Sequence, residues 1–546
     1  MFVATFNYDL LQRADVLYAA ESPNALRPAL KDRQAGSILT ELFSIMLQAL
    51  MIKLLFKNKL FLFCLVLPLQ LVAQKQDRIW LFPDSAGIDF NDLNNPVAIH
   101  CNLVSPDLVS TSIADNSGNL LFYTGGVNLH YRAVRIFDKN GSVMQGGDTL
   151  IGYPWVGQGN MIIPFPDDTN KFYVFICNRD GGIGNSLRIA IVDMSLNLGL
   201  GEVIVRDSLI LFDHINEKLN AVKHANGRDW WVFMQSNSTD SLFHEFLITP
   251  TGLSGPFDQV IGSGANRNKF YGQMIFSRDG SKLGLVSPNA TVDIFDFDRC
   301  NGQLSNYNDV GERLQVDSNT YFGCSFSPNG RLFYTSTWYL HEYKNVYQYD
   351  LASPDIKGSK QIIFSYQDTG AYYQLGFGAH LLGPDDKIYI AKGNSFTGTN
   401  SNTYYTHHID VITDPNNLGV ACNYQPSYFD LGVGRTIEGL PNMLNYNLGP
   451  VVGSICDSLS NDVNQIYERN NFVSLFPNPT YDRMSIRLNS ALNAKLILRN
   501  YLGEIVLEKL VSDNEQLDLS NLNAGTYIGE FLVGQNVVRK KIVKVD

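Results

Sequence analysis

The segment VKHANGRDWW places four side chains with donor, acceptor or titratable groups close together. They are His224, Asn226, Arg228 and Asp229. A neutral imidazole both donates and accepts a hydrogen bond, a guanidinium binds anions, and a carboxylate binds hydroxyl and cationic groups. Such a set is typical of ligand contact, but the same residue types also stabilise tight turns by bonding to backbone amides. We interpret the four residues as a candidate binding group, with turn stabilisation as the alternative.

Gln273 in FYGQMIFS and His380 in QLGFGAHLL are further candidates. Each is a polar residue within an apolar, glycine-containing strand pattern, and Asn160 in GQGNMIIPF has the same character. If these strands line a central channel, their polar side chains can contact a ligand at its mouth. The alternative is an ordinary buried polar group with its hydrogen bonds satisfied.

Signals for metal binding and catalysis are weak. DFDRCNG places Asp296 and Asp298 on one strand face but lacks the further oxygen ligands of a calcium loop. The adjacent histidines of HHID, at His407, point to opposite faces of a strand. The 7 cysteines form no C-x-x-C pair, and the G-x-S-x-G, H-E-x-x-H and P-loop signatures are absent. We therefore assign no catalytic residue, no metal site and no cofactor.

Composition limits the fold and the partners. The chain has 546 residues, with 42 Lys and Arg against 53 Asp and Glu, which gives a net charge of -11. This acidity and the lack of a basic run exclude nucleic acid as an expected partner. Tyr and Phe are abundant and Gly and Asn recur at short intervals, which favours an all-β chain of short strands and tight turns.

A repeat runs through residues 78–446. Each unit has a turn followed by a polar-led apolar strand and then another strand. The second strands read NLLFYTG, KFYVFIC, DWWVFMQ, KLGLVS, RLFYTST and KIYIAKG. The spacing of the units is typical of the four-stranded blades of a β-propeller. Glycines recur in the strand before each turn, where inner strands crowd near the axis.

The ends of this region suggest one more blade. RIWLF at Arg78 resembles a second strand without an inner strand, and GLPNMLNY at Gly439 resembles an inner strand without a successor. Together they would close the ring and remove exposed sheet edges. We predict a seven-bladed β-propeller, with six or eight blades as alternatives.

A targeting segment precedes the repeats. MIKLLFKNKLFLFCLVLPLQLVAQ, from Met51, has a basic start, an apolar run too short to span a bilayer, and a small residue at Ala73. We predict a signal peptide at 51–73, cleaved between Ala73 and Gln74, with residues 1–50 as an upstream extension outside the mature protein. The mature chain then has no transmembrane helix, and its remaining cysteines include candidates for disulfides, whose pairing stays open.

Residues 472–546 follow a linker at 447–471 and show strand alternation with short turns, typical of a small immunoglobulin-like β-sandwich. FPNPT from Phe476, NLNAGTYIGEF from Asn521 and a final Lys-rich strand resemble the type A C-terminal sorting domain of the type IX secretion system of Bacteroidota. The resemblance implies transport across the outer membrane, with the secretion machinery and a sortase-like peptidase as partners. It also implies release or attachment to the outer surface of that membrane.

The repeats themselves resemble propellers of secreted and surface proteins of the same phylum, on WLFPDSAGIDF, SIADNSGNLLFYTGG and GPDDKIYIAKG. The fifth turn departs from that pattern, because Asn329 stands where Asp is usual. The resemblance implies no established reaction. We expect a non-enzymatic glycan- or protein-binding module. The alternatives are a secreted polysaccharide-active hydrolase with carboxylates from different blades, and a surface scaffold without a small ligand.

Overall fold

The structure is a computed structural model that describes residues 74–546, apart from 104–107, 129–132, 156, 181–183, 214, 237–240, 263–270, 313–319, 339–342, 368–375, 394–402, 458–472, 477, 479, 489–492, 501–503, 534–535 and 546. The expected upstream extension, the signal peptide with Ala73, and residues 458–471 of the expected linker lie outside this range.

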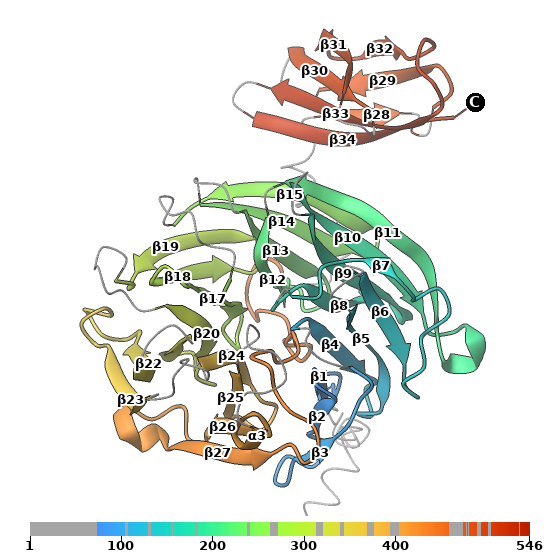
Figure 1. The fold of residues 1–546 in the computed structure, drawn as a ribbon. Helices are drawn as coiled ribbons and strands as arrows, with labels where there is room; N and C mark the ends of the chain where they lie inside the picture. Colours follow the sequence, from blue (N-terminus) through green and yellow to red (C-terminus); the bar gives the residue numbers. More distant parts are fainter. Residues whose placement is uncertain are drawn as a thin grey trace, which may run out of the picture. The chain divides into compact units, whose positions relative to one another are not determined.

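Six four-stranded antiparallel sheets and one three-stranded sheet are arranged around an axis (Figure 1). Each four-stranded sheet, here a blade, is built from consecutive strands, which confirms the expected all-β class. Blade 1 holds β4 (Ser110–Ala114), β5 (Leu120–Asn128), β6 (Ala133–Asp138) and β7 (Leu150–Ile151). Blade 2 holds β8 (Asn160–Phe165), β9 (Asp168–Asp180), β10 (Gly184–Asp193) and β11 (Glu202–Asp213). Blade 3 holds β12 (Ile215–Lys223), β13 (Trp230–Ser236), β14 (Leu242–Thr249) and β15 (Gly252–Val260).

The next three blades follow the same order from the axis outward. Blade 4 holds β16 (Met274–Phe276), β17 (Lys282–Ser287), β18 (Thr291–Asp298) and β19 (Gln303–Asp309). Blade 5 holds β20 (Tyr321–Phe326), β21 (Leu332–Thr337), β22 (Tyr343–Asp350) and β23 (Gln361–Gln367). Blade 6 holds β24 (Gly376–Leu382), β25 (Ile388–Gly393), β26 (His408–Ile412) and β27 (Tyr424–Asp430), with the short helix α3 (Thr403–Thr406).

The three-stranded sheet closes the ring and contains β1 (Ile79–Phe82), β2 (Ala86–Asp89) and β3 (Val97–Ile99). On one side, Ser112 of blade 1 donates a hydrogen bond to the carbonyl of Ile79 at 2.6 Å. On the other, the rings of Trp80 and Tyr389 of blade 6 lie 5.5 Å apart. The expected count of seven blades stays a prediction, because this sheet has no fourth strand among the described residues.

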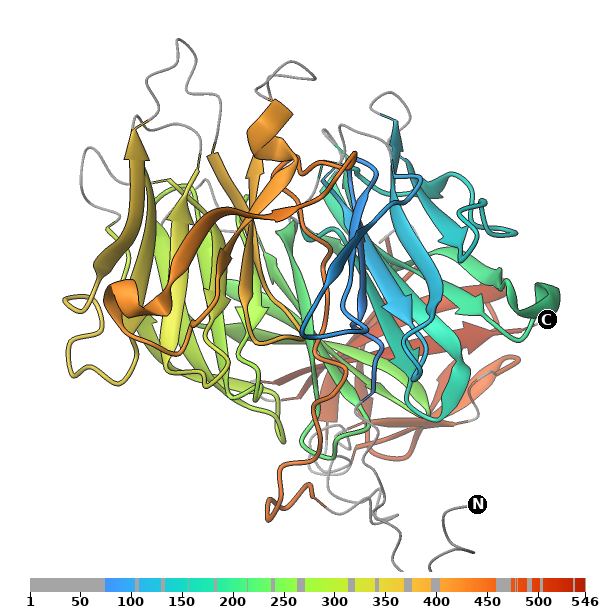
Figure 2. The same ribbon diagram turned by 90° about the horizontal axis from the view of Figure 1, so that it is seen from below.

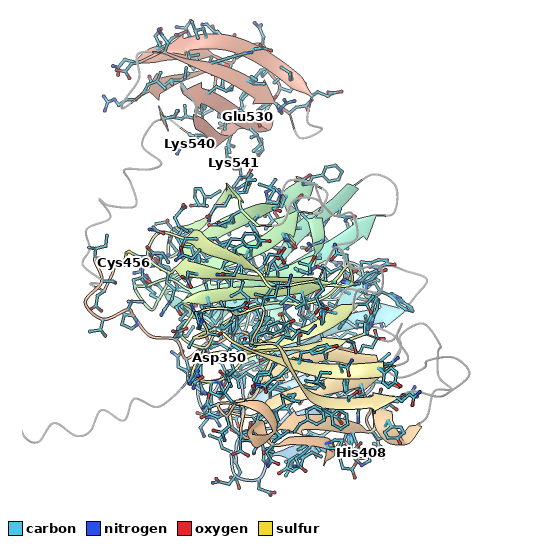
Figure 3. All side chains as sticks on the ribbon, turned by 90° about the vertical axis from the view of Figure 1, so that its left-hand side faces the viewer. Asp350, His408, Cys456, Glu530, Lys540 and Lys541 are labelled. Atoms are coloured by element: carbon cyan, nitrogen blue, oxygen red, sulfur yellow. A yellow bond between two sulfur atoms is a disulfide. The ribbon has the colours of Figure 1, made fainter. Side chains whose placement is uncertain are left out.

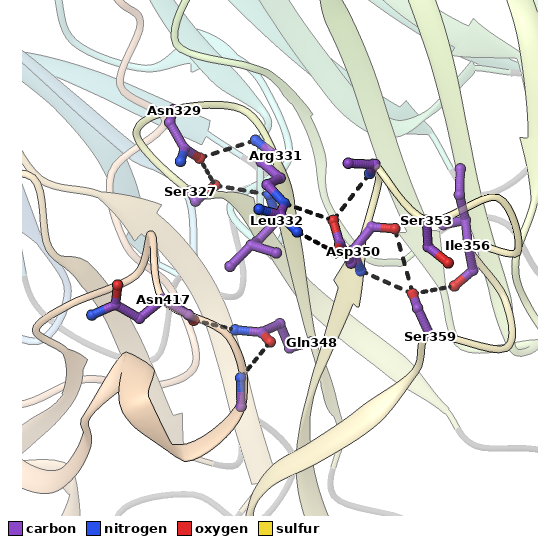
Figure 4. Close-up of polar contacts among 12 residues, drawn as sticks. Ser327, Asn329, Arg331, Leu332, Gln348, Asp350, Ser353, Ile356, Ser359 and Asn417 are labelled. Carbon is purple, nitrogen blue, oxygen red and sulfur yellow. Dashed lines mark hydrogen bonds and ion pairs between the residues drawn. The ribbon is translucent and has the colours of Figure 1, made fainter.

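The turn between the first and second strands of blade 5 is stabilised by side-chain hydrogen bonds to backbone amides, as its sequence predicts (Figure 4). Asn329 Oδ1 accepts a hydrogen bond from the Ser327 hydroxyl at 2.7 Å and from the amide of Arg331 at 3.1 Å. Ser327 Oγ accepts the amide of Leu332 at 2.9 Å, and Arg331 makes two bonds to Asp350. Asn329 therefore performs the role expected of Asp in this turn.

Glycine permits the close approach of inner strands. A Cβ on Gly323 of β20 would lie 2.2 Å from the carbonyl oxygen of Gly378 of β24, and one on Gly378 would lie 2.1 Å from that of Glu438. Both distances are too short for any side chain, so the crowding predicted for these inner strands is present.

The expected inner strand at 439–446 is absent, although all these residues are described. Residues 435–450, here called the axial segment, instead run along the axis between the blades (Figure 2). The carbonyl of Glu438 accepts the amide of Ala379 in β24 at 2.7 Å, and the amide of Asn442 donates to Ser110 in β4 at 2.9 Å. Because Pro441 lacks an N–H, the segment is unsuited to a continuous ladder with one strand.

Side-chain amides complete the links across the axis. Asn442 Nδ2 donates to the carbonyls of Asn160 in β8 and Leu219 in β12, at 3.1 and 3.0 Å. Gln158 pairs with the backbone of Met274 in β16, through bonds of 2.9 and 2.8 Å. A carboxamide both donates and accepts, so one side chain can satisfy both kinds of backbone group on an unpaired strand edge.

The exit of the axial segment is fastened to blades 3 and 4. Arg299 Nη2 donates to the carbonyl of Gly449 at 2.6 Å, and the amide of Val451 donates to Ala225 at 2.8 Å. Cys456 (labelled in Figure 3) forms a disulfide with Cys300 across a separation of 156 residues.

The C-terminal part consists of two sheets around a hydrophobic core of its own that includes Leu496, Phe531 and Ile542. One sheet holds β28 (Ser474–Phe476), β29 (Arg483–Arg487) and β32 (Glu515–Asp518). The other holds β31 (Ile505–Ser512), β30 (Asn493–Arg499), β33 (Gly525–Val533) and β34 (Asn536–Lys544). The immunoglobulin-like classification stays a prediction. In the described part of the chain, no helix is long and apolar enough to cross a membrane.

We predict that Asn442→Ala destabilises the propeller by about 2–4 kcal/mol, because it leaves two buried carbonyls without a donor. All 5 tryptophans precede residue 339, so tryptophan fluorescence during denaturation reports on the propeller alone. The control is Asn417→Ala, an exposed side chain with one long bond to Ala421. Equal stability of the two variants would contradict the axial role of Asn442.

We also predict that replacing Cys300 and Cys456 together by Ser lowers the free energy of unfolding by roughly 2–4 kcal/mol, because the disulfide closes a long loop in the unfolded chain. The measurement is chemical denaturation with and without reductant. Reductant should shift the natural chain by the same amount and leave the double variant unchanged. A shift in the double variant would assign the effect to other cysteines.

Candidate functional site

The four polar residues of the His224 segment lie in one turn of blade 3 and bond to one another there. Asn226 Oδ1 accepts the amides of Arg228 and Asp229, each at 3.0 Å, and Asn226 Nδ2 donates to Asp229 at 2.9 Å. Arg228 Nε pairs with Asp229 at 2.8 Å. The geometry thus brings all four residues together and satisfies them mutually, as in the turn alternative.

His224 connects this turn to the disulfide-bearing turn of blade 4. Its Nε2 donates to the carbonyl of Cys300 at 3.0 Å, and its Nδ1 accepts the amide of Asn226 at 3.1 Å. Burial lowers the pKa of His224, which matches a neutral ring with one donor and one acceptor. His224 is 2% exposed, so a ligand-binding role for it stays an untested prediction.

Gln273 and His380 join the inner strands of blades 4, 5 and 6. Gln273 Oε1 accepts the amides of Cys324 at 2.9 Å and His380 at 2.8 Å, and its Nε2 donates to the carbonyl of His380 at 3.1 Å. His380 Nε2 lies 2.7 Å from the Ser336 hydroxyl, and full burial lowers the pKa of His380 to about 3. The Gln273 side chain therefore serves the backbone at the axis, whereas the His380 ring bonds to the side chain of Ser336. The contact of either side chain with a ligand stays a prediction.

Asp296 and His407, the candidates considered for metal binding, also have polar partners within the protein. Asp296 pairs with Lys282 at 2.6 Å and accepts the side-chain amide of Asn306 at 2.8 Å. His407 Nδ1 lies 2.6 Å from the carbonyl of Gly434. Across the described ranges, no group of three or more His, Cys, Asp or Glu side chains is arranged to hold a metal ion.

A cavity of about 400 Å³ lies beside the axial segment. The blade side of its wall comes from the ends of β12, β16, β20 and β24, and the opposite side comes from the axial segment and from the chain entering β1. Its lining residues are Asp77, Trp80, Asn220, Ala221, Val222, Ile275, Phe276, Ser277, Arg278, Ser325, Phe326, Leu381, Leu382, Gly383, Pro384, Met443, Leu444, Asn445, Asn447 and Leu448. Its volume lies within the range of small-molecule sites, and both apolar and polar side chains contribute to its walls.

Two polar atoms of the lining lack a hydrogen-bond partner among the described residues. They are Asp77 Oδ1 and Trp80 Nε1. Asp77 Oδ2 accepts a bond from Asn447 at 3.3 Å, and Arg78 Nε lies 3.8 Å from Oδ1. Loss of hydration raises the pKa of Asp77 to about 6, against the opposing effect of Arg78 and Arg278. A shifted carboxyl group in a cavity marks a candidate site.

The charges in this cavity are few. Asp77 is the one carboxylate among the described lining residues, and Arg278 is the one guanidinium. Arg278 also forms an ion pair with the exposed Asp386. A glycosidase of the usual kind needs two carboxylates facing each other, which this lining does not supply. One carboxylate and one guanidinium are therefore the charged groups among the described residues that line this cavity.

The sequence did not single out Asp77, Trp80 or Asn442. Trp80 and Asn442 stand in RIWLF and GLPNMLNY, which indicated only the closing of the ring. The predicted closing of the ring was the one sequence feature that could have indicated this cavity. A ring closed by both ends of the propeller region brings residues near 80 and 440 together.

Comparison with known proteins assigns the end of the chain. A family model described as secretion system C-terminal sorting domain matches residues 474–545. These residues are a type IX sorting domain. The sorting domain directs the protein to export, as a secreted or cell-surface product, and implies contact with the type IX secretion machinery.

Solved structures similar to the chain are β-propeller proteins. The periplasmic gluconolactonase of Pseudomonas aeruginosa is 15% identical, with 71% of this chain and 94% of that chain covered and a TM-score of 0.35. The β-propeller domain of Cps50 (Swd1) from Myceliophteria thermophila is 11% identical, with 58% of this chain and 93% of that chain covered and a TM-score of 0.33. No curated protein matches the chain.

We predict that Asp77→Asn stabilises the protein above pH 6 by up to about 3 kcal/mol. The folded-state pKa of about 6 lies above the ordinary 3.8, so the folded chain binds this proton more tightly than the unfolded chain. In the natural protein, the free energy of unfolding therefore falls as the pH rises from the ordinary pKa of 3.8 to the folded-state pKa of about 6, and it stays lower above that pH. The gain in the variant should vanish below about pH 4.

Denaturation of both proteins at several pH values measures this gain. The control is Asp148→Asn, whose carboxylate is exposed and paired with Arg135. It should change stability by less than about 1 kcal/mol. A destabilised Asp77→Asn variant at pH 8 would show that the carboxylate is needed for folding.

Proposed function

We propose that the protein is a type IX secretion cargo that acts outside the cell as a ligand-binding β-propeller, with the cavity beside the axial segment as its binding site. In this proposal, a signal peptide at 51–73 is removed between Ala73 and Gln74, and residues 78–446 form the propeller. The linker at 447–471 connects it to the sorting domain, taken as 472–546. A sortase-like peptidase then removes that domain, and the product is released or attached to the outer surface of the outer membrane.

One observation carries the choice of binding over hydrolysis. Asp77 is the one carboxylate among the described residues that line the cavity. General acid and nucleophile, or general acid and base, are two separate carboxyl groups in most glycosidases. A cavity with a single carboxyl group can hold a ligand through a strong hydrogen bond without supplying both roles.

The rigidity of the walls supports the same proposal. The inner strands that line the cavity are bonded to one another through Gln158 and Gln273, and Asn220 Nδ2 donates to Met274 at 2.8 Å. Walls held in this way lose little conformational freedom when a ligand binds.

The test is a glycan array with the chain that begins at Gln74, together with an assay for released reducing ends on the glycans that bind. We expect binding without release of sugar. The variant His224→Ala, on the same array, tests the residues singled out in the sequence and should bind as the natural chain does, because His224 is buried in a turn. Sugar release would support the hydrolase, and binding to no glycan would overturn the proposal.

A further inference from the structure

We propose that the outward face of the larger sheet of the sorting domain binds a protein of the type IX secretion machinery. This sheet consists of β31, β30, β33 and β34. The binding surface is a cluster of apolar side chains around two ion pairs, here called the docking face. The inference goes beyond the proposed function, because it concerns the sorting domain and not the cavity of the propeller.

Four exposed apolar residues lie at the corners of the docking face. They are Leu510 and Ile505 of β31, exposed by 66% and 51%, and Ile528 and Leu532 of β33, exposed by 40% and 37%. β31 and β33 flank β30, so the two pairs lie about 10 Å apart across the sheet. None of the four belongs to the hydrophobic core of the sorting domain. Their apolar surface is therefore available to a partner.

β30 lies between the two apolar pairs. Its outward residues there are Lys495, Ile497 and Arg499. In the strand register, each basic residue lies between two of the apolar corners, and Ile497 lies between Glu508 and Glu530. Lys495 pairs with Glu508 at 2.7 Å, and Arg499 pairs with Glu530 at 3.5 Å. The central charges of the docking face therefore neutralise one another.

The outward face of the other sheet of this domain is different. The outward side chains of β29 and β32 are all polar, namely Arg483, Ser485, Arg487, Gln516 and Asp518. A solvated face of an antiparallel sheet is normally polar in this way. The docking face departs from that rule, and a cluster of exposed apolar residues indicates an interaction surface.

Charge and family together identify the occupant. Lys541 of β34 is exposed and lies opposite Ile528 in the register, so it adds one basic group at the edge of an otherwise neutral face. This arrangement fits a partner that offers apolar contacts and a carboxylate at the matching edge. It does not fit an anionic membrane, which attracts clusters of basic residues. Because the domain is a type IX sorting signal, the partner is a protein of that machinery.

The first experiment follows export of the full precursor in a bacterium that has a type IX secretion system. A photo-cross-linking amino acid replaces Leu510 on the docking face or, as the control, Arg487 on the other sheet. We expect light to join position 510, but not position 487, to a component of the secretion machinery. A cross-link from position 510 to a second copy of the chain, to its own propeller or to lipid, or no cross-link there, would overturn the inference.

Variants measure how much the docking face contributes to export. Ile528→Thr and Leu532→Thr together remove apolar surface and keep residues that favour strands. This double variant should lower the exported fraction by about fivefold or more and leave precursor in the periplasm, because a few apolar side chains carry most of the binding free energy of such surfaces. Lys541→Glu should act in the same direction, since it reverses the charge at the edge.

Two matched controls make the same changes elsewhere. Ile362→Thr alters an exposed strand isoleucine of the propeller, and Arg483→Glu reverses an exposed charge on the other sheet. Both should be exported normally. Limited proteolysis of the purified chains that begin at Gln74 shows whether the sorting domain stays folded. Normal export of the double variant would overturn the inference. If the double variant unfolds, Lys541→Glu decides, and its normal export would overturn the inference as well.

Discussion

The inner edge of each propeller blade is the constraint on which the rest of this structure depends. The innermost strand of a sheet has one row of backbone N–H and C=O groups with no neighbouring strand, and these groups are buried at the axis, where each lost hydrogen bond is unfavourable. Here the partners are carboxamides and a passing chain. Gln273 serves β20 and β24, Gln158 serves β16, and Asn442 serves β4, β8 and β12. The blades are thereby bonded to one another at their narrowest point as well as packed through apolar faces.

The position of the axial segment explains the cavity. Its hydrogen bonds run to β4, β8, β12 and β24, and Tyr446 donates to the carbonyl of Ile162 in β8 at 2.9 Å. The cavity opens between this segment and the ends of β12, β16, β20 and β24. Asp77 is one of its lining residues because the chain enters the closing sheet there, and loss of hydration raises the pKa of this carboxyl group. A buried carboxyl group with a raised pKa lowers the free energy of unfolding at neutral pH. Such groups are found often at binding sites, where function and stability conflict.

The sequence predicted those features of the fold that depend on residues close together in the chain. The repeated turns, the glycines of the inner strands and the two-sheet C-terminal part follow from neighbouring residues, and Asn329 shows that even a departure from the usual turn residue was interpreted correctly. The site was harder, because its contacts are remote in the chain. Gln158 and Asn442 are 284 residues apart, and Asp77 and Asn447 are 370 apart. His224 drew attention as a polar cluster, but crowded polar residues are equally the mark of a well-satisfied turn.

The order of features along the C-terminal chain separates the propeller from its sorting signal. The axial segment comes first, then the disulfide at Cys456, and then the sorting domain, which has a hydrophobic core independent of the blades. Chain cleavage anywhere beyond Cys456 leaves the axial segment bonded to the inner strands and its exit held to Cys300. The hydrogen bonds that close the ring therefore do not depend on the domain that directs export. A protein arranged in this way can lose its sorting signal and keep both its fold and the cavity that the axial segment helps to form.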